Sequence, residues 1–195
     1  MLIFTETYSL PFGRGKRWAG GINRAADFLI GGWAITSATN FSGGLPFTPG
    51  LSSCSPSSDT GPCRPDRVSS VKNGARSGDP TLGGYWFENT GGVTLSTAGQ
   101  SAGPWAQPAL GTFGNIGRDT FRGPKLFNTD MTVFKDFAIT ERTKAQFQAQ
   151  FYNVFNHVNF DLPNTTVDAS NGGSINNIAY GTQMRALTFA LKLNF

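Results

Sequence analysis

A chain of 195 residues is long enough for one domain, but only 14% of its residues are charged, where about 25% is usual in soluble domains. Its 25 glycines and 13% aromatic residues indicate strands, turns and an apolar surface, and they exclude a disordered chain. The net charge of +4 is not gathered into a basic stripe, so we expect no nucleic-acid partner.

The first half of the chain predicts two strands followed by a long loop. Residues 1–8 form a short apolar strand, which ends where Pro11 and two nearby glycines mark a turn. Residues 28–43 alternate between apolar and polar side chains and predict a second strand. The apolar run 28–35 is far shorter than the roughly 20 residues of a membrane helix, and its glycine pair argues against any helix there.

Residues 44–126 lack periodicity and predict a long loop rich in Gly, Pro, Ser, Thr and Asn. Such a loop is uncommon inside a compact soluble domain, whereas outer-membrane barrels carry long loops on one side. Cys54 and Cys63 lie in this loop, and a disulfide between them would restrain it by about 2–3 kcal/mol. Two free thiols, or half of a zinc site, are the alternatives, although one histidine offers few further ligands.

Three further strands are predicted at residues 127–139, 142–155 and 185–195, with a second long loop at 156–184. Within 144–152 apolar and polar residues alternate, but Phe147, Phe151, Val154 and Phe155 also fit a helical spacing. We favour the strand because its neighbours on both sides also alternate with period two.

These strands predict an all-β fold, an antiparallel up-and-down meander of about five strands that forms part of a transmembrane β-barrel. The short turns fall at one end and both long loops at the other, as in outer-membrane barrels. If Phe195 lies at the periplasmic side, both long loops lie outside the cell. A soluble pair of sheets with the aromatic residues as its core is the alternative.

The alternation assigns side chains to two faces. The lipid-facing set is Met131, Val133, Phe147, Phe151, Leu187, Phe189 and Leu191. The lumen-facing set is Asp130, Thr132, Lys144, Gln146, Gln148 and Gln150.

We expect no catalytic, metal or cofactor site, and hence no enzyme. His157 is the only histidine, and no G-x-S-x-G nucleophile motif is present. We interpret His157 as a polar residue where a strand leaves the membrane interface. The stretch 168–174 fails the spacing of a calcium loop, and the glycine-rich stretches lack the Lys-Ser/Thr of a phosphate loop.

Residues 111–160 resemble the C-terminal end of TonB-dependent outer-membrane receptors of the Oar-like type, which carry a carboxypeptidase-regulatory-like domain. The pieces that carry the resemblance are "GNIGR", "RGP", "FNTDMTVFKDF", "ITER" and "YNVFNHVNF". Upstream, "YSLPFGRGKRW" and "IGGWAITSATNFSGGLPFT" look like the two preceding strands of these receptors. The resemblance implies a place in the outer membrane of a Gram-negative type of cell, among its lipids, and uptake of a ligand through a 22-stranded barrel with a plug and TonB as partner.

The last strand is similar to the signal that the barrel-assembly machinery reads. Thr188, Ala190, Leu193 and Phe195 occupy its positions, although Ala190 replaces a glycine and Leu193 an aromatic residue. Because no plug, TonB-contacting motif or signal peptide is found, we expect the receptor's missing N-terminal part to supply them from a longer chain. The sequence does not name the ligand. The alternative is a small secreted β-sheet binding or adhesion module, which the apolar stripe argues against.

Overall fold

The structure is a computed structural model that describes residues 1–53, 63–74, 84–140 and 143–194. The chain folds into two compact units. Unit 1 comprises Met1–Ser42, Phe127–Val158 and Gly181–Phe195, and unit 2 comprises Gly43–Leu126 and Asn159–Tyr180.

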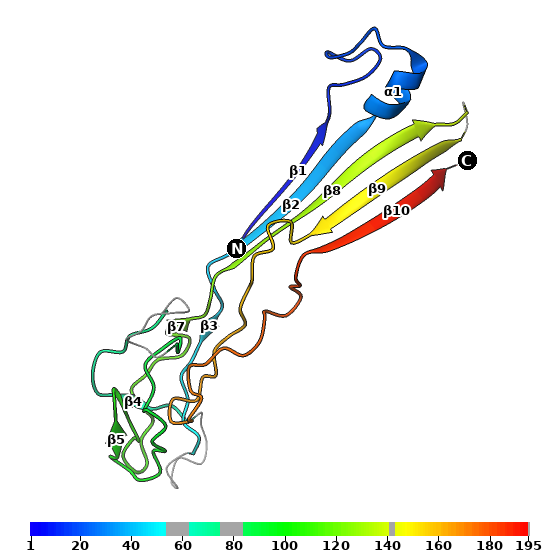
Figure 1. Cartoon of the computed structure of the whole chain (residues 1–195). Coiled ribbons are helices and arrows are strands. Elements are labelled where there is room, and N and C mark those ends of the chain that lie inside the picture. The colour runs from blue at the N-terminus through cyan, green and yellow to red at the C-terminus, as the bar shows by residue number, and fades with distance from the viewer. Residues whose placement is uncertain (54–62, 75–83, 141–142, 195) are drawn as a thin grey trace. The chain divides into compact units, whose positions relative to one another are not determined.

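Unit 1 is an antiparallel sheet of five strands in the order β1-β2-β8-β9-β10 (Figure 1). The strands are β1 (Leu2–Ser9), β2 (Trp33–Ser42), β8 (Leu126–Ala138), β9 (Lys144–Tyr152) and β10 (Ala186–Asn194). Neighbours in the sheet follow one another along the chain, so the predicted all-β meander is confirmed. Residues 144–152 are strand β9 and not the helix that their spacing also allowed.

The predicted strand at 28–43 is wrong at its start, because residues 24–30 form helix α1 (Arg24–Ile30). The Asn23 side chain caps this helix by accepting a hydrogen bond of 2.8 Å from the Ala26 N–H. Gly31 ends the helix, and Gly32, with φ of 71°, redirects the backbone into β2. The glycine pair therefore separates a helix from a strand. In the described part of the chain, no helix is long and apolar enough to cross a membrane.

Unit 2 is more ordered than the long loops predicted at 44–126 and 156–184. It contains one sheet of β3 (Pro46–Phe47) and β7 (Phe121–Arg122), and another of β4 (Asp66–Arg67), β6 (Trp105–Ala106) and β5 (Ser101–Ala102). These strands surround a buried core, which consists of Phe47, Leu51, Phe87, Leu95, Trp105, Ile116, Phe121 and Val167. The core residues follow no regular spacing along the sequence, so a search for alternating apolar and polar residues does not identify them.

Two local features hold unit 2 together. Gly44 has φ of 91°, and a Cβ there would collide with the carbonyl oxygen of Gly123, so the two backbones cross where only glycine fits. Asp168 is 1% exposed and accepts hydrogen bonds from Ser52 N (2.7 Å), Ser52 Oγ (2.6 Å) and Leu95 N (3.2 Å). One buried carboxylate thus joins three segments that are distant in the sequence.

Candidate membrane-spanning surface

The pairing of β8, β9 and β10 divides the sheet into an apolar and a polar face. Residues directly opposite in an antiparallel pair point to the same face. Phe151 lies opposite both Met131 and Leu187, and Phe147 lies opposite Leu191. The apolar face defined by these registers carries Met131, Val133, Phe137, Ala145, Phe147, Ala149, Phe151, Leu187, Phe189, Leu191 and Leu193. All seven predicted lipid-facing residues are among them.

The opposite, polar face carries all six predicted lumen-facing residues. It consists of Asp130, Thr132, Phe134, Asp136, Lys144, Gln146, Gln148, Gln150, Tyr152, Ala186, Thr188, Ala190 and Lys192, with Ala138 at its end. The structure therefore brings each predicted set together on one face. It remains a prediction that the apolar face meets lipid and that the polar face meets the barrel lumen.

A continuous hydrogen-bonded ladder follows β9 along the polar face. Gln146 Nε2 donates to Asp136 Oδ1 at 2.9 Å, and Gln148 Nε2 donates to Gln146 Oε1 at 2.6 Å. Gln150 Nε2 donates to Gln148 Oε1 at 3.4 Å, and Tyr152 Oη donates to Gln150 Oε1 at 2.8 Å. Each amide is oriented by its neighbour two residues away, so the ladder presents a fixed row of donors and acceptors. The sequence identified these residues but not the bonds between them.

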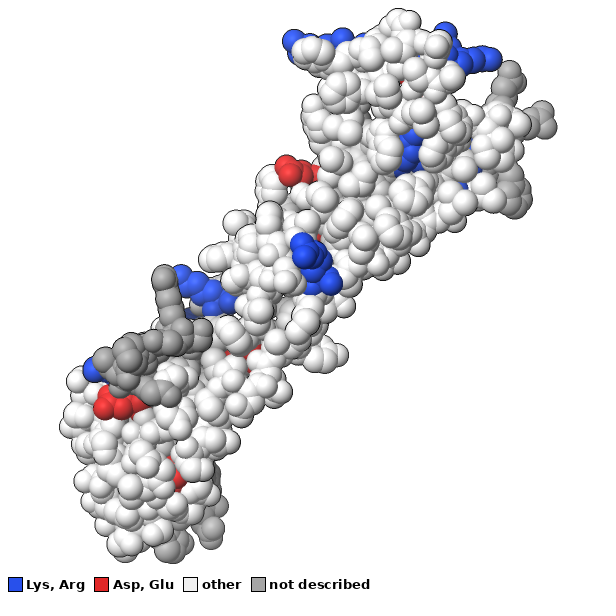
Figure 2. All heavy atoms as spheres, viewed as in Figure 1, with Lys and Arg blue, Asp and Glu red and all other residues white. Residues whose placement is uncertain are grey.

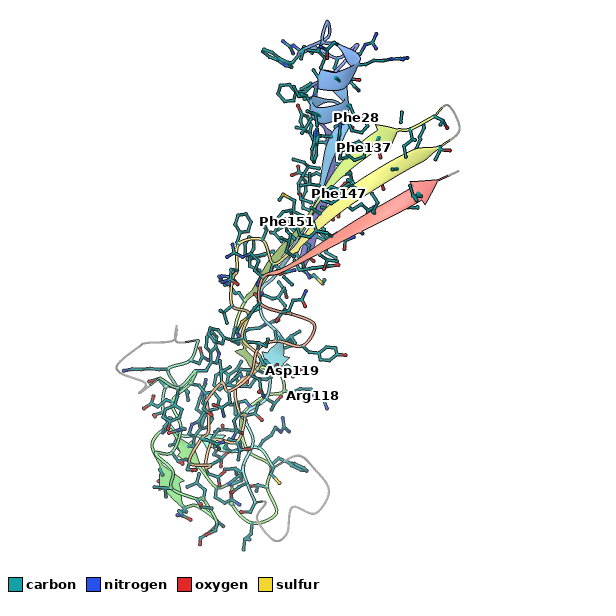
Figure 3. The ribbon with its side chains drawn as sticks, turned by 45° about the vertical axis from the view of Figure 1, so that its right-hand side comes forward. Phe28, Arg118, Asp119, Phe137, Phe147 and Phe151 are labelled. Carbon is teal, nitrogen blue, oxygen red and sulfur yellow. The ribbon has the colours of Figure 1, made fainter. Side chains whose placement is uncertain are left out.

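The apolar face exposes large side chains that water does not favour. The rings of Phe147 and Phe189 stack with centroids 5.9 Å apart, and Phe189 is 62% and Leu191 67% exposed. Figure 3 shows Phe147 and Phe151 following one another along β9. A contiguous apolar patch of this kind marks a surface that another apolar phase covers.

The sequence matches the family described as outer membrane beta barrel domain over residues 1–187. The chain belongs to this family. It is therefore an outer-membrane protein, and its five-stranded sheet is part of a β-barrel. No curated protein and no solved structure matches the chain.

Strand lengths agree with this outer-membrane barrel assignment. β8 has 13 residues and β9 and β10 have 9 each, and a tilted transmembrane strand needs about 9–11. Apolar side chains on the outside of such barrels face lipid, as predicted for the apolar face of this sheet.

Lys135 is a cation on the apolar face, opposite Phe147, and the sequence analysis missed it. Its side chain is 2% exposed, and its Nζ donates to the carbonyl oxygen of Gly31 at the end of α1. The Nζ also lies 5.6 Å from the centroid of the Trp33 ring and 5.2 Å from that of Phe137. The available signal was a lysine among the apolar side chains on one face of the strand. A buried cation needs partners, so such a lysine predicts a specific contact.

Replacing Lys135 with alanine is expected to detach α1 from the sheet. The variant loses a charged hydrogen bond and two cation–π contacts, together about 1–3 kcal/mol of stabilisation. Hydrogen exchange of the backbone amides of residues 26–32 should accelerate. Lys192→Ala, on the polar face, is the control and should leave this exchange unchanged. Equal exchange in the Lys135 variant and the parent would show that the helix is held by other contacts.

The remaining predicted site residues lie apart from these faces or keep their roles as predictions. Thr188 and Ala190 are on the polar face and Leu193 is on the apolar one, while Phe195 lies outside the described residues. Cys63 packs against the core of unit 2, but Cys54 lies outside the described residues, so the disulfide stays a prediction. The His157 ring packs edge-on against Phe127 with centroids 5.8 Å apart. Within the described residues no cluster of His, Cys, Asp and Glu could hold a metal.

Proposed function

We propose that this chain forms part of the barrel of a TonB-dependent receptor of the Oar-like type, which takes up a ligand across the outer membrane without catalysis. The observation that carries the proposal is the amide ladder on the face opposite the apolar one. A plug inside a barrel needs a wall that offers oriented hydrogen-bonding groups. The ladder amides retain donor and acceptor capacity beyond the bonds that they make to one another.

The connections between strands support the same proposal. Both long connections, from β2 to β8 and from β9 to β10, leave the same end of the antiparallel sheet. In outer-membrane barrels the longer loops are extracellular. Unit 2, which contains most of these residues, has its own buried core and thus a preorganised surface, which lowers the cost of binding a ligand.

A photo-reactive amino acid placed in β9 tests whether the polar face contacts a plug. In the protein expressed in its own outer membrane, the probe at Gln148 is expected to form cross-links to a plug domain. The probe at the adjacent Phe147, on the apolar face, is the matched control and should give cross-links to lipid only. Plug cross-links from Phe147, or none from Gln148, would contradict the proposal.

The energised step needs a separate test. Cross-linking in intact cells is expected to recover TonB with the protein, as the resemblance to these receptors implies. An adhesion protein without import would be extracted from the outer membrane without TonB. The barrel-assembly machinery is a further proposed partner, through the last strand and its residues Thr188, Ala190 and Leu193.

A further inference from the structure

A cleft of about 620 Å³ lies in unit 1 between α1 and the end of β8. Its lining includes Arg14, Arg24, Asp27, Phe28, Phe137 and Ile139. No predicted site residue lines it, and it meets the amide ladder only at Asp136, which accepts from Gln146. Its volume is within the range of about 300–1,000 Å³ that is usual for sites of small organic ligands.

One side of the cleft is apolar and continues the apolar face of the sheet. The rings of Phe28 and Phe137 are in contact, with centroids 4.9 Å apart, and both lie at the α1 end of the sheet (Figure 3). Phe137 lies opposite Ala145, in the row of side chains that ends the apolar face. Phe28 remains 52% and Ile139 58% exposed, so this wall is open to a ligand that enters from the apolar face.

The other side of the cleft carries two arginines. Arg14 and Arg24 line it beside Asp27 and Asp136, and both arginines are exposed. Lys16 and Arg17 are exposed in the same segment, and residues 10–26 contain no Asp or Glu. Figure 2 shows Lys and Arg side chains gathered at the end of unit 1 that carries α1. Among the described residues, neither the Arg14 nor the Arg24 guanidinium has a hydrogen-bond or ion-pair partner.

The acidic groups of the cleft are already engaged elsewhere. Asp27 Oδ1 accepts a hydrogen bond of 2.7 Å from the Arg14 backbone N–H. Its negative charge also interacts favourably with the ammonium group of buried Lys135. The Asp136 carboxylate accepts from Gln146 on the polar face. Both carboxylates keep their charge, but neither is hydrogen-bonded to the Arg14 or Arg24 guanidinium, so the donors of these two groups are open to an anion.

We propose that this cleft binds an anionic phospholipid, with its phosphate between Arg14 and Arg24 and an acyl chain against Phe28, Phe137 and Ile139. An apolar wall that joins a membrane-facing surface fits the chain, and paired guanidiniums fit a phosphate. The cleft lies at the end of the sheet opposite the one from which both long connections leave, and in outer-membrane barrels that end faces the periplasmic, phospholipid leaflet. This inference needs only the outer-membrane location and does not rest on TonB-dependent uptake.

The test is competition between lipids on the detergent-purified protein, extracted from the outer membrane and observed by native mass spectrometry. With equal amounts of phosphatidylglycerol and phosphatidylcholine, the parent protein is expected to retain phosphatidylglycerol preferentially. Arg14→Gln with Arg24→Gln should reduce this retention by about 30-fold, because two basic contacts are lost. Phe28→Ser should weaken retention of both lipids.

A matched control separates the cleft from general charge. Arg118→Gln with Lys125→Gln removes the same charge from exposed positions of unit 2 and should leave the lipid preference unchanged. Equal retention of both lipids by the parent would overturn the proposal. So would the same loss in both double variants. Circular dichroism of each variant verifies that the sheet is intact.

Discussion

Arginine at Leu191 is expected to lower the free energy of unfolding of the barrel by about 2–4 kcal/mol, the cost of a cation near the middle of a lipid-facing surface. Arginine at the adjacent Ala190 is expected to change it by less than about 1 kcal/mol. The two positions share one strand and nearly one depth, but Leu191 lies opposite Phe147 and Ala190 opposite Gln148. They differ in the face that the side chain occupies.

The measurement is urea unfolding of the protein refolded into lipid vesicles, which does not depend on the assembly signal that includes Ala190. Leu191→Arg should show an earlier midpoint, and Ala190→Arg should resemble the parent. If both substitutions cost the same, the assignment of the apolar face to lipid is wrong. If Ala190→Arg alone is costly, the two faces are reversed.

Alanine at Asp168 is expected to destabilise unit 2 by about 2–4 kcal/mol. The substitution removes three hydrogen bonds to a buried carboxylate, one of them from the N–H of the fully buried Leu95. It also frees Ser52 from the segment that carries Asp168. Unit 1 shares none of these bonds, so its stability should be retained.

Hydrogen exchange at increasing urea concentrations separates the two units. Peptides that contain Leu95 and Trp105 should exchange at lower urea in Asp168→Ala, while peptides from β8 and β9 should not change. Asp119→Asn is the control, because Asp119 is exposed, its carboxylate accepts one hydrogen bond of 3.4 Å from Thr48, and asparagine tolerates its φ of 56°. Unchanged exchange around Leu95 would show that the carboxylate does not hold the segments together.

The long loops were the least predictable part of the fold. Strand alternation appears in the sequence because every second residue meets the same environment. The core of unit 2 instead brings together Phe47, Phe87, Trp105, Phe121 and Val167, whose spacing is set by irregular turns. These contacts join residues far apart in the sequence, so they cannot be predicted from the spacing of neighbouring residues. The glycine and proline content that predicted loops also supplies the turns of a compact unit.

Helix α1 shows how a local pattern is overridden. Its apolar Phe28, Leu29 and Ile30 continue the apolar character of β2, so one strand was predicted over both. The cap at Asn23 and the two glycines after Ile30 divide the run, and Lys135 holds the helix end. This lysine comes from β8, more than one hundred residues away, so its contact could not be read from the N-terminal sequence.

By itself, the sequence determined the five main strands, their order as a meander and the two faces of the sheet. These features depend on period two and on connection length, which are local properties. The tertiary structure decided the amide ladder, the buried Lys135, the Asp168 junction and the cleft beside α1. Each of these depends on side chains from separate segments meeting at hydrogen-bond or van der Waals distance, and only the folded chain sets those distances.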